Sequence, residues 1–359
     1  MNNSIEILED FIYKKKLLRQ EHRLSYLIWE PTKKCNLSCL HCFNSSSPNI
    51  IEKDILTTQE VKNVLNDIYR AYDTTKITFA ISGGEPLVRE DIYEILSYAT
   101  KLRYSVALTT NGMLIDKETI QKLIDSGLRN IAISIDGIKE KHNQLRGSTV
   151  SYDRALNALK MIKKYAPFMK TTIITCVNSM NIDTINLFIK EIAQYKPCII
   201  RLVPFISSGR GLINKYLSLS KEQFIYLLNY TTKIRKDRDF FSNITFGNEG
   251  YYGPEFEMKV RDDFHYEHAG IHLASITYNG YVKGSTDISD EFIEGNIRKN
   301  SFVDIWENRF HRYREGKRDL YNPMCKDCIH WDLCEGGGFN LYEEYKILGE
   351  CRYKFLFDS

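Results

Sequence analysis

The sequence predicts an α/β protein in which a partial barrel of six β/α units, a (β/α)6 TIM barrel, is followed by a C-terminal α+β domain. Short apolar, β-branched runs alternate with stretches of helical periodicity from residue 25 to about 236. This alternation is typical of right-handed βαβ units and a parallel sheet. Beyond residue 237 the alternation stops, and seven of the nine Cys residues fall into two clusters, one in each part.

Composition limits the classes of protein that need to be considered. The chain has 359 residues, 43% of them hydrophobic, and a formal net charge of +3, which is too small to indicate a nucleic-acid partner. No apolar run is long enough to cross a bilayer, and the first ten residues lack the pattern of a secretory signal. We therefore expect a cytoplasmic protein without a membrane partner, whose Cys residues are metal ligands or catalytic thiols.

Three regions follow one another along the chain. Residues 1–24 read as an amphipathic N-terminal lead-in with Lys14 to Lys16 and Arg19 on a solvated face. Residues 25–236 form the predicted partial barrel, and residues 237–359 the C-terminal domain. Six buried strands are predicted in the barrel, at Tyr26–Trp29, Ile77–Ile81, Ser105–Thr110, Asn130–Ile135, Thr171–Val177 and Ile199–Val203.

Local signals place helices and one hairpin between these strands and after them. Thr57 and Glu60 form a capping box before one helix, and Ser151 begins another. Apolar residues 271–276, the turn Asn279-Gly280 and Tyr281-Val282 predict a β-hairpin. Ser301 is expected to cap a helix that buries Phe302, Ile305 and Trp306.

The loop after the first strand carries three thiols, Cys35, Cys39 and Cys42, in a CxxxCxxC pattern. A cubane iron-sulfur cluster normally takes four Cys ligands. A set of three therefore leaves one iron open to a small chelating molecule. With His41, the same loop also fits a Cys3His zinc site.

The second strand runs into Ser82-Gly83-Gly84-Glu85-Pro86. Paired glycines allow a ligand to approach the backbone closely, and the carboxylate of Glu85 can accept a hydrogen bond from a ligand ammonium. Strand ends of a parallel barrel share one mouth, so we expect this segment to face the Cys35 loop.

Together these segments resemble the radical S-adenosylmethionine (SAM) superfamily. The resemblance rests on the CxxxCxxC loop, the GGEP segment, the turn Thr110-Asn111-Gly112, and Ser134-Ile-Asp136-Gly137 followed by Leu145-Arg146-Gly147. It implies a [4Fe-4S] cluster whose open iron binds SAM, and a 5′-deoxyadenosyl radical that removes a hydrogen atom from a substrate. It also implies cluster ligation by Cys35, Cys39 and Cys42, and SAM contacts by His41, Gly83, Gly84, Glu85, Asn111, Ser134, Asp136 and Arg146.

The second cluster consists of Cys325, Cys328, Cys334 and Cys351. Four such thiols fit a structural zinc site. Behind a radical SAM core, however, they resemble the SPASM extension, which holds auxiliary [4Fe-4S] clusters. The positions that would ligate an inner auxiliary cluster are Glu267, Ser285 and Gly338 here, so the resemblance implies one auxiliary cluster with full Cys ligation.

Cys176 in the fifth strand could donate a hydrogen atom to a substrate radical if it faces the barrel mouth; otherwise it is a buried structural residue. His268 and His272 share one face of a strand, but a metal site there would need further ligands.

The resemblance favours an oxidoreductase-type peptide maturase that crosslinks, epimerises or oxidises a ribosomally made precursor peptide, with a flavodoxin- or ferredoxin-type electron donor. Two alternatives remain open at this stage. One is radical oxidation or decarboxylation of a small molecule such as a tetrapyrrole or a sugar, and the other is a non-catalytic zinc-binding protein.

Overall fold

The computed structural model describes residues 2–237, 243–247, 250–262, 265–315, 325–342 and 351–357. Within them, ten strands form one sheet in the order β10-β9-β8-β1-β2-β3-β4-β5-β6-β7. The strands are β1 Tyr26–Trp29, β2 Thr78–Ile81, β3 Ser105–Thr110, β4 Asn130–Ser134, β5 Lys170–Val177, β6 Ile199–Pro204, β7 Asn243–Phe246, β8 Leu273–Ile276, β9 Tyr281–Lys283 and β10 Gly295–Asn296.

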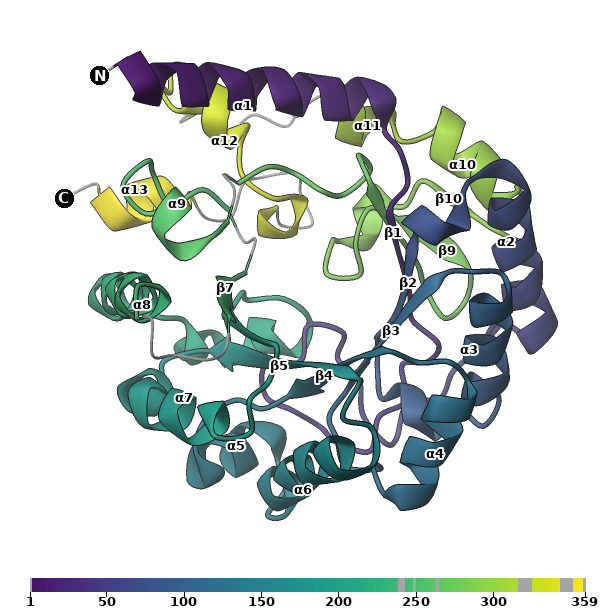
Figure 1. Ribbon diagram of the computed structural model, residues 1–359. Helices are drawn as coiled ribbons and strands as arrows, with labels where there is room; N and C mark the ends of the chain where they lie inside the picture. Colours follow the sequence, from purple (N-terminus) through teal and green to yellow (C-terminus); the bar gives the residue numbers. More distant parts are fainter. Residues whose placement is uncertain are drawn as a thin grey trace.

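Figure 1 shows that the sheet curls into an open arc with helices along its outer side. C-terminal segments lie across the gap between β7 and β1, and α1 runs over them. The helices are α1 Asn2–Glu21, α2 Thr58–Ala71, α3 Ile92–Lys101, α4 Lys117–Asp125, α5 Lys139–Arg146, α6 Ser151–Tyr165, α7 Ile185–Ala193, α8 Lys221–Arg235, α9 Glu257–Val260, α10 Phe302–Asn308, α11 His311–Arg314, α12 Trp331–Cys334 and α13 Arg352–Phe357. In the described ranges, no helix combines the length and the apolar character that a membrane crossing requires.

All six predicted barrel strands are present, and each neighbouring pair from β1 to β6 is parallel. A seventh strand, β7, was not predicted; it pairs in parallel with β6. Its four residues, Asn-Ile-Thr-Phe, are too short a run for periodicity to indicate a strand. The partial α/β barrel is therefore confirmed and is one strand longer than expected.

The predicted hairpin is present as β8 and β9, which pair in antiparallel fashion. Strand β8 also pairs in parallel with β1, with Tyr26 opposite Leu273. One continuous sheet thus crosses the predicted boundary near residue 237. The boundaries at residues 24 and 237 stay predictions.

Helix caps agree with the sequence at two of three positions. Thr57 and Glu60 form the capping box of α2, and the Ser301 hydroxyl accepts from the Asp304 amide at the start of α10. Ser151 is not a cap: its hydroxyl donates to the Asn143 side chain (2.9 Å), whose oxygen also accepts from the amide of residue 152. The side chain of Asn143 thus accepts from a backbone amide at the start of α6, which is the role expected of the Ser151 side chain.

The lead-in helix α1 differs from the expectation of a fully solvated charged face. Lys14 and Lys16 are exposed, but the Lys15 side chain is buried, and its ammonium donates to the carbonyl oxygens of Asp332 (2.6 Å) and Leu333 (3.2 Å). Arg19 forms an ion pair with Glu335. These contacts fix α1 on α12, the short helix that ends at Cys334.

Successive side chains along the central strands point alternately toward the outer helices and into the barrel lumen. Outward side chains such as Ile133, Ile173 and Leu202 are fully buried beneath the helices. Inward side chains such as Cys176 and Arg201 line a cavity. The outer layer therefore holds the fold together and leaves the lumen free for polar groups.

Candidate active site

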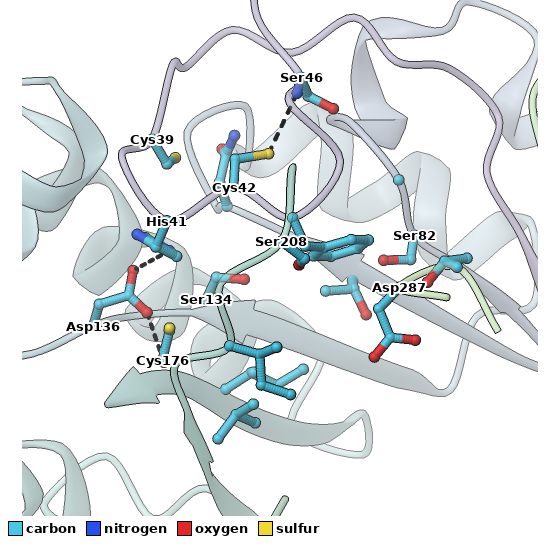
Figure 2. A pocket seen from close by; sticks show the side chains of 18 of the residues that line it. Cys39, His41, Cys42, Ser46, Ser82, Ser134, Asp136, Cys176, Ser208 and Asp287 are labelled. Carbon is cyan, nitrogen blue, oxygen red and sulfur yellow. Dashed lines mark hydrogen bonds and ion pairs between the residues drawn. The ribbon is translucent and has the colours of Figure 1, made fainter. Parts of the chain in front are cut away.

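A cavity of about 400 Å³ lies at the carboxyl ends of the barrel strands (Figure 2). It brings together predicted residues from the Cys35 loop, the GGEP segment, the Asn111 turn, the Ser134-to-Arg146 region and the fifth strand. Those that line it are Cys35, Cys39, His41, Cys42, Gly83, Gly84, Asn111, Ser134, Asp136, Arg146 and Cys176. Of the predicted barrel residues, Glu85 alone is not in this lining.

Each of the three thiols in the Cys35 loop receives a nitrogen donor. The Asn111 amide lies 3.7 Å from the sulfur of Cys35, and an Arg146 nitrogen 3.8 Å from that of Cys39. The backbone amide of Ser46 donates to Cys42 at 3.3 Å. Hydrogen bonds to cysteinyl sulfur are one of the factors that set the potential of an iron-sulfur cluster. Asn111 and Arg146 thus contact the Cys loop itself, in addition to lining the cavity where SAM contacts were expected.

Burial favours protonated thiols in this loop when no cation is present. It raises the pKa of Cys35 to about 12 and also raises the pKa of Cys39. A bound metal centre supplies the positive charge that keeps such sulfurs as thiolates. Three thiols that line one cavity, each with a nitrogen donor, fit the ligand set of a metal cluster.

Arg210, which sequence reasoning missed, fixes the conformation of the Cys35 loop. Its guanidinium donates to the carbonyl oxygens of Cys39 (2.7 Å) and Ser46 (2.6 Å). The preceding Gly209 has φ +53°, and a Cβ there would lie 1.9 Å from the Phe43 carbonyl oxygen. The signal that could have identified this contact is the run Ser-Gly-Arg-Gly at residues 208–211, directly after the sixth strand.

The glycines of the GGEP segment allow two loops to approach each other. A Cβ on Gly84 would lie 2.1 Å from the Lys34 carbonyl oxygen. The amide of residue 85 donates to that same oxygen at 2.9 Å. Gly83 and Gly84 both line the cavity, so their backbone faces the Cys35 loop as expected.

The side chain of Glu85 has hydrogen-bond partners within the protein. Its carboxylate is fully buried and accepts from the Thr110 hydroxyl (2.8 Å) and from the amides of Asn111 (2.9 Å) and Leu87 (3.2 Å). These three donors leave acceptor capacity on the carboxylate, so the expected contact of Glu85 with a ligand ammonium stays a prediction. The carboxylate also fixes the end of β3 against the GGEP segment.

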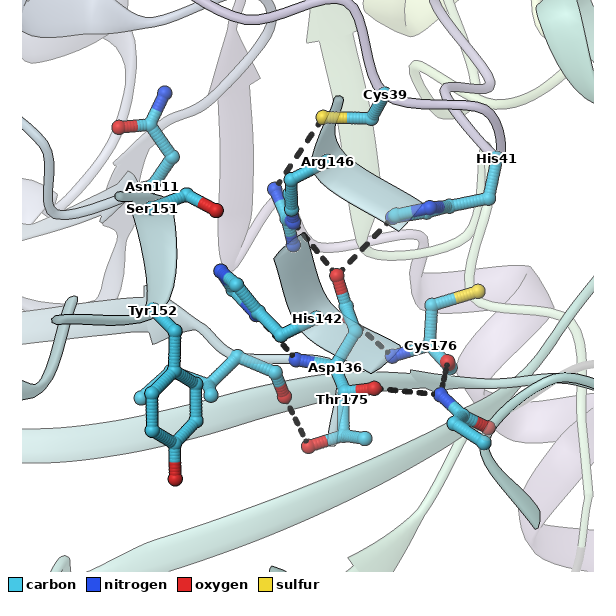
Figure 3. A network of polar contacts seen from close by, with 12 residues as sticks. Cys39, His41, Asn111, Asp136, His142, Arg146, Ser151, Tyr152, Thr175 and Cys176 are labelled. Atoms are coloured by element: carbon cyan, nitrogen blue, oxygen red, sulfur yellow. Dashed lines mark hydrogen bonds and ion pairs between the residues drawn. The ribbon is translucent and has the colours of Figure 1, made fainter. Parts of the chain in front are cut away.

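A buried charged network connects the Cys35 loop with β4, α5 and β5 (Figure 3). The Arg146 Nε donates to the Asp136 carboxylate at 2.6 Å, His41 Nε2 lies 3.3 Å from the same oxygen, and the Cys176 amide donates to the other oxygen at 3.0 Å. Burial alone would raise the pKa of Asp136, but the Arg146 cation holds it well below its usual range. Burial lowers the pKa of His41 to about 4, so this ring is neutral at pH 7.

Two smaller side chains complete the wall of the cavity. Ser134 ends β4 and forms no side-chain hydrogen bond with the residues that the structure describes, so its hydroxyl is available to a ligand. Cys176 is half-buried and points into the cavity from β5, as Figure 2 shows. The condition for a role of Cys176 at the barrel mouth is met, and its role as a hydrogen donor or as a structural residue stays a prediction.

The four C-terminal thiols converge on a second, much smaller cavity of about 30 Å³. Cys325, Cys328, Cys334 and Cys351 all line it, with aromatic walls from Tyr251 and Tyr353 among others. Four thiols around one mostly apolar space fit an iron-sulfur cluster with four Cys ligands.

A partial α/β barrel with three thiols at its mouth and a four-thiol site in its C-terminal region defines an iron-sulfur enzyme of the SAM-dependent class. Residues 29–192 match the Radical SAM superfamily, and residues 268–329 match SPASM, described as an iron-sulfur cluster-binding domain. The chain thus carries a radical SAM domain followed by a SPASM domain. Its cofactors are [4Fe-4S] clusters and SAM.

Relatives of known activity fall into two groups. The chain is 26% identical over 337 residues to the Fe-coproporphyrin III synthase of Methanosarcina barkeri, covering 86% of this chain and 82% of that protein. It is 28% identical over 329 residues to the mycofactocin maturase MftC of Mycolicibacterium smegmatis, covering 87% and 77%. The crystal structure of Streptococcus suis SuiB bound to S-adenosylmethionine shares the fold, with a TM-score of 0.71 at 19% identity over 96% of this chain and 81% of that one.

Proposed function

We propose that this radical SAM enzyme is a peptide maturase that abstracts a hydrogen atom from a side chain or α-carbon of a ribosomally made precursor peptide. The observation that carries the proposal is the single cavity that joins the three thiols of the Cys35 loop to the predicted SAM contacts. The bound cluster and SAM supply a 5′-deoxyadenosyl radical, which can take hydrogen from an unactivated carbon.

Residues of the chain would hold these groups as follows. Cys35, Cys39 and Cys42 would ligate three irons, and the Ser134 hydroxyl would bind the nucleoside. Arg146 has five N–H groups. Asp136 and Cys39 account for two of them, so the guanidinium can still bind the carboxylate of SAM. Cys325, Cys328, Cys334 and Cys351 would form one auxiliary cluster.

Access to the cavity supports a peptide substrate. A groove of about 700 Å³ adjoins the cavity, since Phe43, Ser208 and Asp287 line both. Exposed apolar side chains surround its mouth, with Leu212 and Tyr281 in the groove and Ile213, 82% exposed, beside it. Among the relatives, MftC is a maturase, and SuiB has been solved bound to its precursor peptide SuiA.

A second candidate is oxidation or decarboxylation of a tetrapyrrole. It is favoured by the likeness to the Fe-coproporphyrin III synthase and to the AdoMet-dependent heme synthase of Methanosarcina barkeri, which is 27% identical over 330 residues. Incubation of the reduced enzyme with SAM and either coproporphyrin III or short peptides encoded beside its gene separates the two. A mass change in a peptide supports the proposal, whereas a mass change in the porphyrin alone refutes it.

Iron analysis after anaerobic reconstitution tests the cofactor assignment. The wild-type chain should bind about eight irons, and a variant with Cys35, Cys39 and Cys42 all changed to Ala about four, with loss of SAM cleavage. The matched control is Cys198→Ala, which removes an exposed thiol outside both sites. Full iron content and SAM cleavage in the triple variant would exclude this loop as the active cluster.

A further inference from the structure

A second chamber of about 520 Å³ adjoins the candidate active-site cavity. The two spaces are continuous, because Ser82, Thr109, Arg201, Val203, Asp287 and Asn340 line both. Its wall also contains Glu267, Ser285 and Gly338, the three positions where an inner auxiliary cluster would have its ligands. The structure thus gathers these three positions around open space next to the active site.

Hydrogen bonds hold the walls of this chamber together. The Glu267 carboxylate accepts from the amides of Phe339 (2.8 Å) and Ala269 (3.0 Å). The Asp287 carboxylate accepts from Ser285 (2.6 Å) and from the Asn340 amide (3.0 Å). Both carboxylates on the wall are therefore bound by the protein's own donors, and the segments around residues 267, 285 and 340 remain connected without a cluster between them.

Arg201 contributes a cation to the chamber. It lies on β6 opposite Ile174 and Thr245, between the buried residues Ile200 and Leu202, so its side chain points into the lumen, where it is exposed. Among the residues that the structure describes, Arg201 has no hydrogen-bond or ion-pair partner for its guanidinium. An exposed guanidinium without a protein partner has its N–H donors free for a ligand that supplies the opposite charge.

Two groups of the chamber that feel the charge of Arg201 are neutral at pH 7. Burial lowers the pKa of His268 to about 3 and raises the pKa of Tyr26 above its usual value, so neither carries a charge at pH 7. His268 Nδ1 lies 2.7 Å from His272 Nε2, and these two rings and Tyr26 line the chamber as hydrogen-bonding groups. Among the described residues of its wall, the chamber therefore offers Arg201 as a cation without a partner, beside neutral rings and two carboxylates that accept hydrogen bonds from other protein groups.

We propose that Arg201 binds a carboxylate of the substrate, and that the chamber beside the active-site cavity holds the part of the substrate that carries this group. The planar guanidinium matches a carboxylate in a bidentate arrangement. The proposal deepens the proposed function and rests on it, because it assigns the chemical class of the substrate to the same site. A peptide carboxylate and a tetrapyrrole propionate share this chemistry.

Binding to the reconstituted holoenzyme with SAM tests the proposal without any turnover. The probes are 3-phenylpropionate and its uncharged amide, measured by calorimetry. We expect the wild type to bind the carboxylate at least about tenfold more tightly than the amide, Arg201→Gln to lose this preference, and Arg201→Lys to retain part of it. Arg154→Gln, which removes an exposed arginine of α6, is the control and should behave as the wild type.

Competition then identifies the source of the carboxylate. Displacement of 3-phenylpropionate by N-acetyltyrosine but not by coproporphyrin III supports a peptide carboxylate, and the reverse supports a tetrapyrrole propionate. Absence of any carboxylate preference in the wild type, or an unchanged preference in Arg201→Gln, overturns the proposal. Failure of the proposed function is a separate result, because it is recorded as a mass change in the porphyrin alone and not as the binding of a probe.

Discussion

Arg146 and Asp136 form a buried ion pair, with Nε 2.6 Å from Oδ2, and a second nitrogen of the same guanidinium lies 3.8 Å from the sulfur of Cys39. Asp136 also accepts from the backbone amide of Cys176. This one pair thus connects the loop that carries the thiols with the barrel strand on the opposite wall of the cavity. The position of the Cys35 loop in the mouth depends on it.

Asp136→Asn keeps the shape of the carboxylate but leaves Arg146 as an uncompensated buried cation. Breaking one partner of a buried pair costs about 3–5 kcal/mol. We expect a correspondingly lower urea midpoint for the cluster-loaded protein, measured anaerobically by circular dichroism. The control is Asp153→Asn, which removes a half-exposed pair with Lys139 and should cost less than about 1 kcal/mol. Equal midpoints for the two variants would contradict this prediction.

Glu30 provides a pH-dependent prediction. It is 2% exposed, its carboxyl accepts from the Asn44 amide at 2.9 Å, and burial raises its pKa to about 7 from the usual 4.5. Between pH 4.5 and 7 the folded protein holds a proton that the unfolded chain has released, so stability falls as pH rises through this window. Above pH 7 the loss is complete.

Glu30→Gln removes this titration and keeps an oxygen for Asn44. The variant should therefore gain stability relative to the wild type between pH 5 and pH 8, measured as the difference in urea midpoint at each pH. Glu118→Gln, on the exposed surface of α4, controls for the loss of a carboxylate. A difference between wild type and Glu30→Gln that is the same at both pH values would rule out the titration of Glu30 as its cause.

The docking of α1 on α12 depends on Lys15. Hydrogen bonds from a charged group contribute about 1.5–3 kcal/mol, and Lys15 donates two to the carbonyl oxygens just before Cys334. We expect Lys15→Met to speed amide hydrogen exchange in α1 by about tenfold or more, because the helix separates more often from α12. The exposed neighbour Lys16 supplies the control, Lys16→Met; equal exchange in both variants would show that the Lys15 contacts do not hold the helix.

Arg210 is expected to control how firmly the Cys35 loop holds iron. Arg210→Gln removes the bonds to the carbonyl oxygens of Cys39 and Ser46, so the loop should open more readily. Iron release to a chelator, followed by absorbance, should be about tenfold faster, in line with the loss of one or two charged hydrogen bonds. Arg154→Gln provides the comparison on the surface of α6. If Arg210→Gln releases iron at the wild-type rate, the contacts of Arg210 do not control how firmly the Cys35 loop holds iron.

The sequence predicted those features that depend on local pattern. Strand periodicity located β1 to β6, and motif spacing brought Cys35, Gly83 and Ser134 to one mouth. It could not predict features that depend on tertiary contact: the pairing of β8 with β1, the burial of Lys15 and the carbonyl contacts of Arg210. A lysine on an amphipathic helix can be buried only when another segment supplies hydrogen-bond acceptors for its ammonium group. For Glu85 the motif was correct, and the orientation of the carboxylate depended on donors from the next strand.

The position of Cys176 in the cavity wall leads to a prediction about its thiol. It faces the cavity from β5, across from the Cys35 loop, so a substrate radical formed there would lie within the same space as its thiol. If the thiol supplies a hydrogen atom to that radical, Cys176→Ala should reduce product formation more strongly than it reduces SAM cleavage. The measurement is the ratio of product to 5′-deoxyadenosine by mass spectrometry, with Cys198→Ala as the control. A ratio equal to that of the wild type would show that Cys176 serves only as part of the cavity wall.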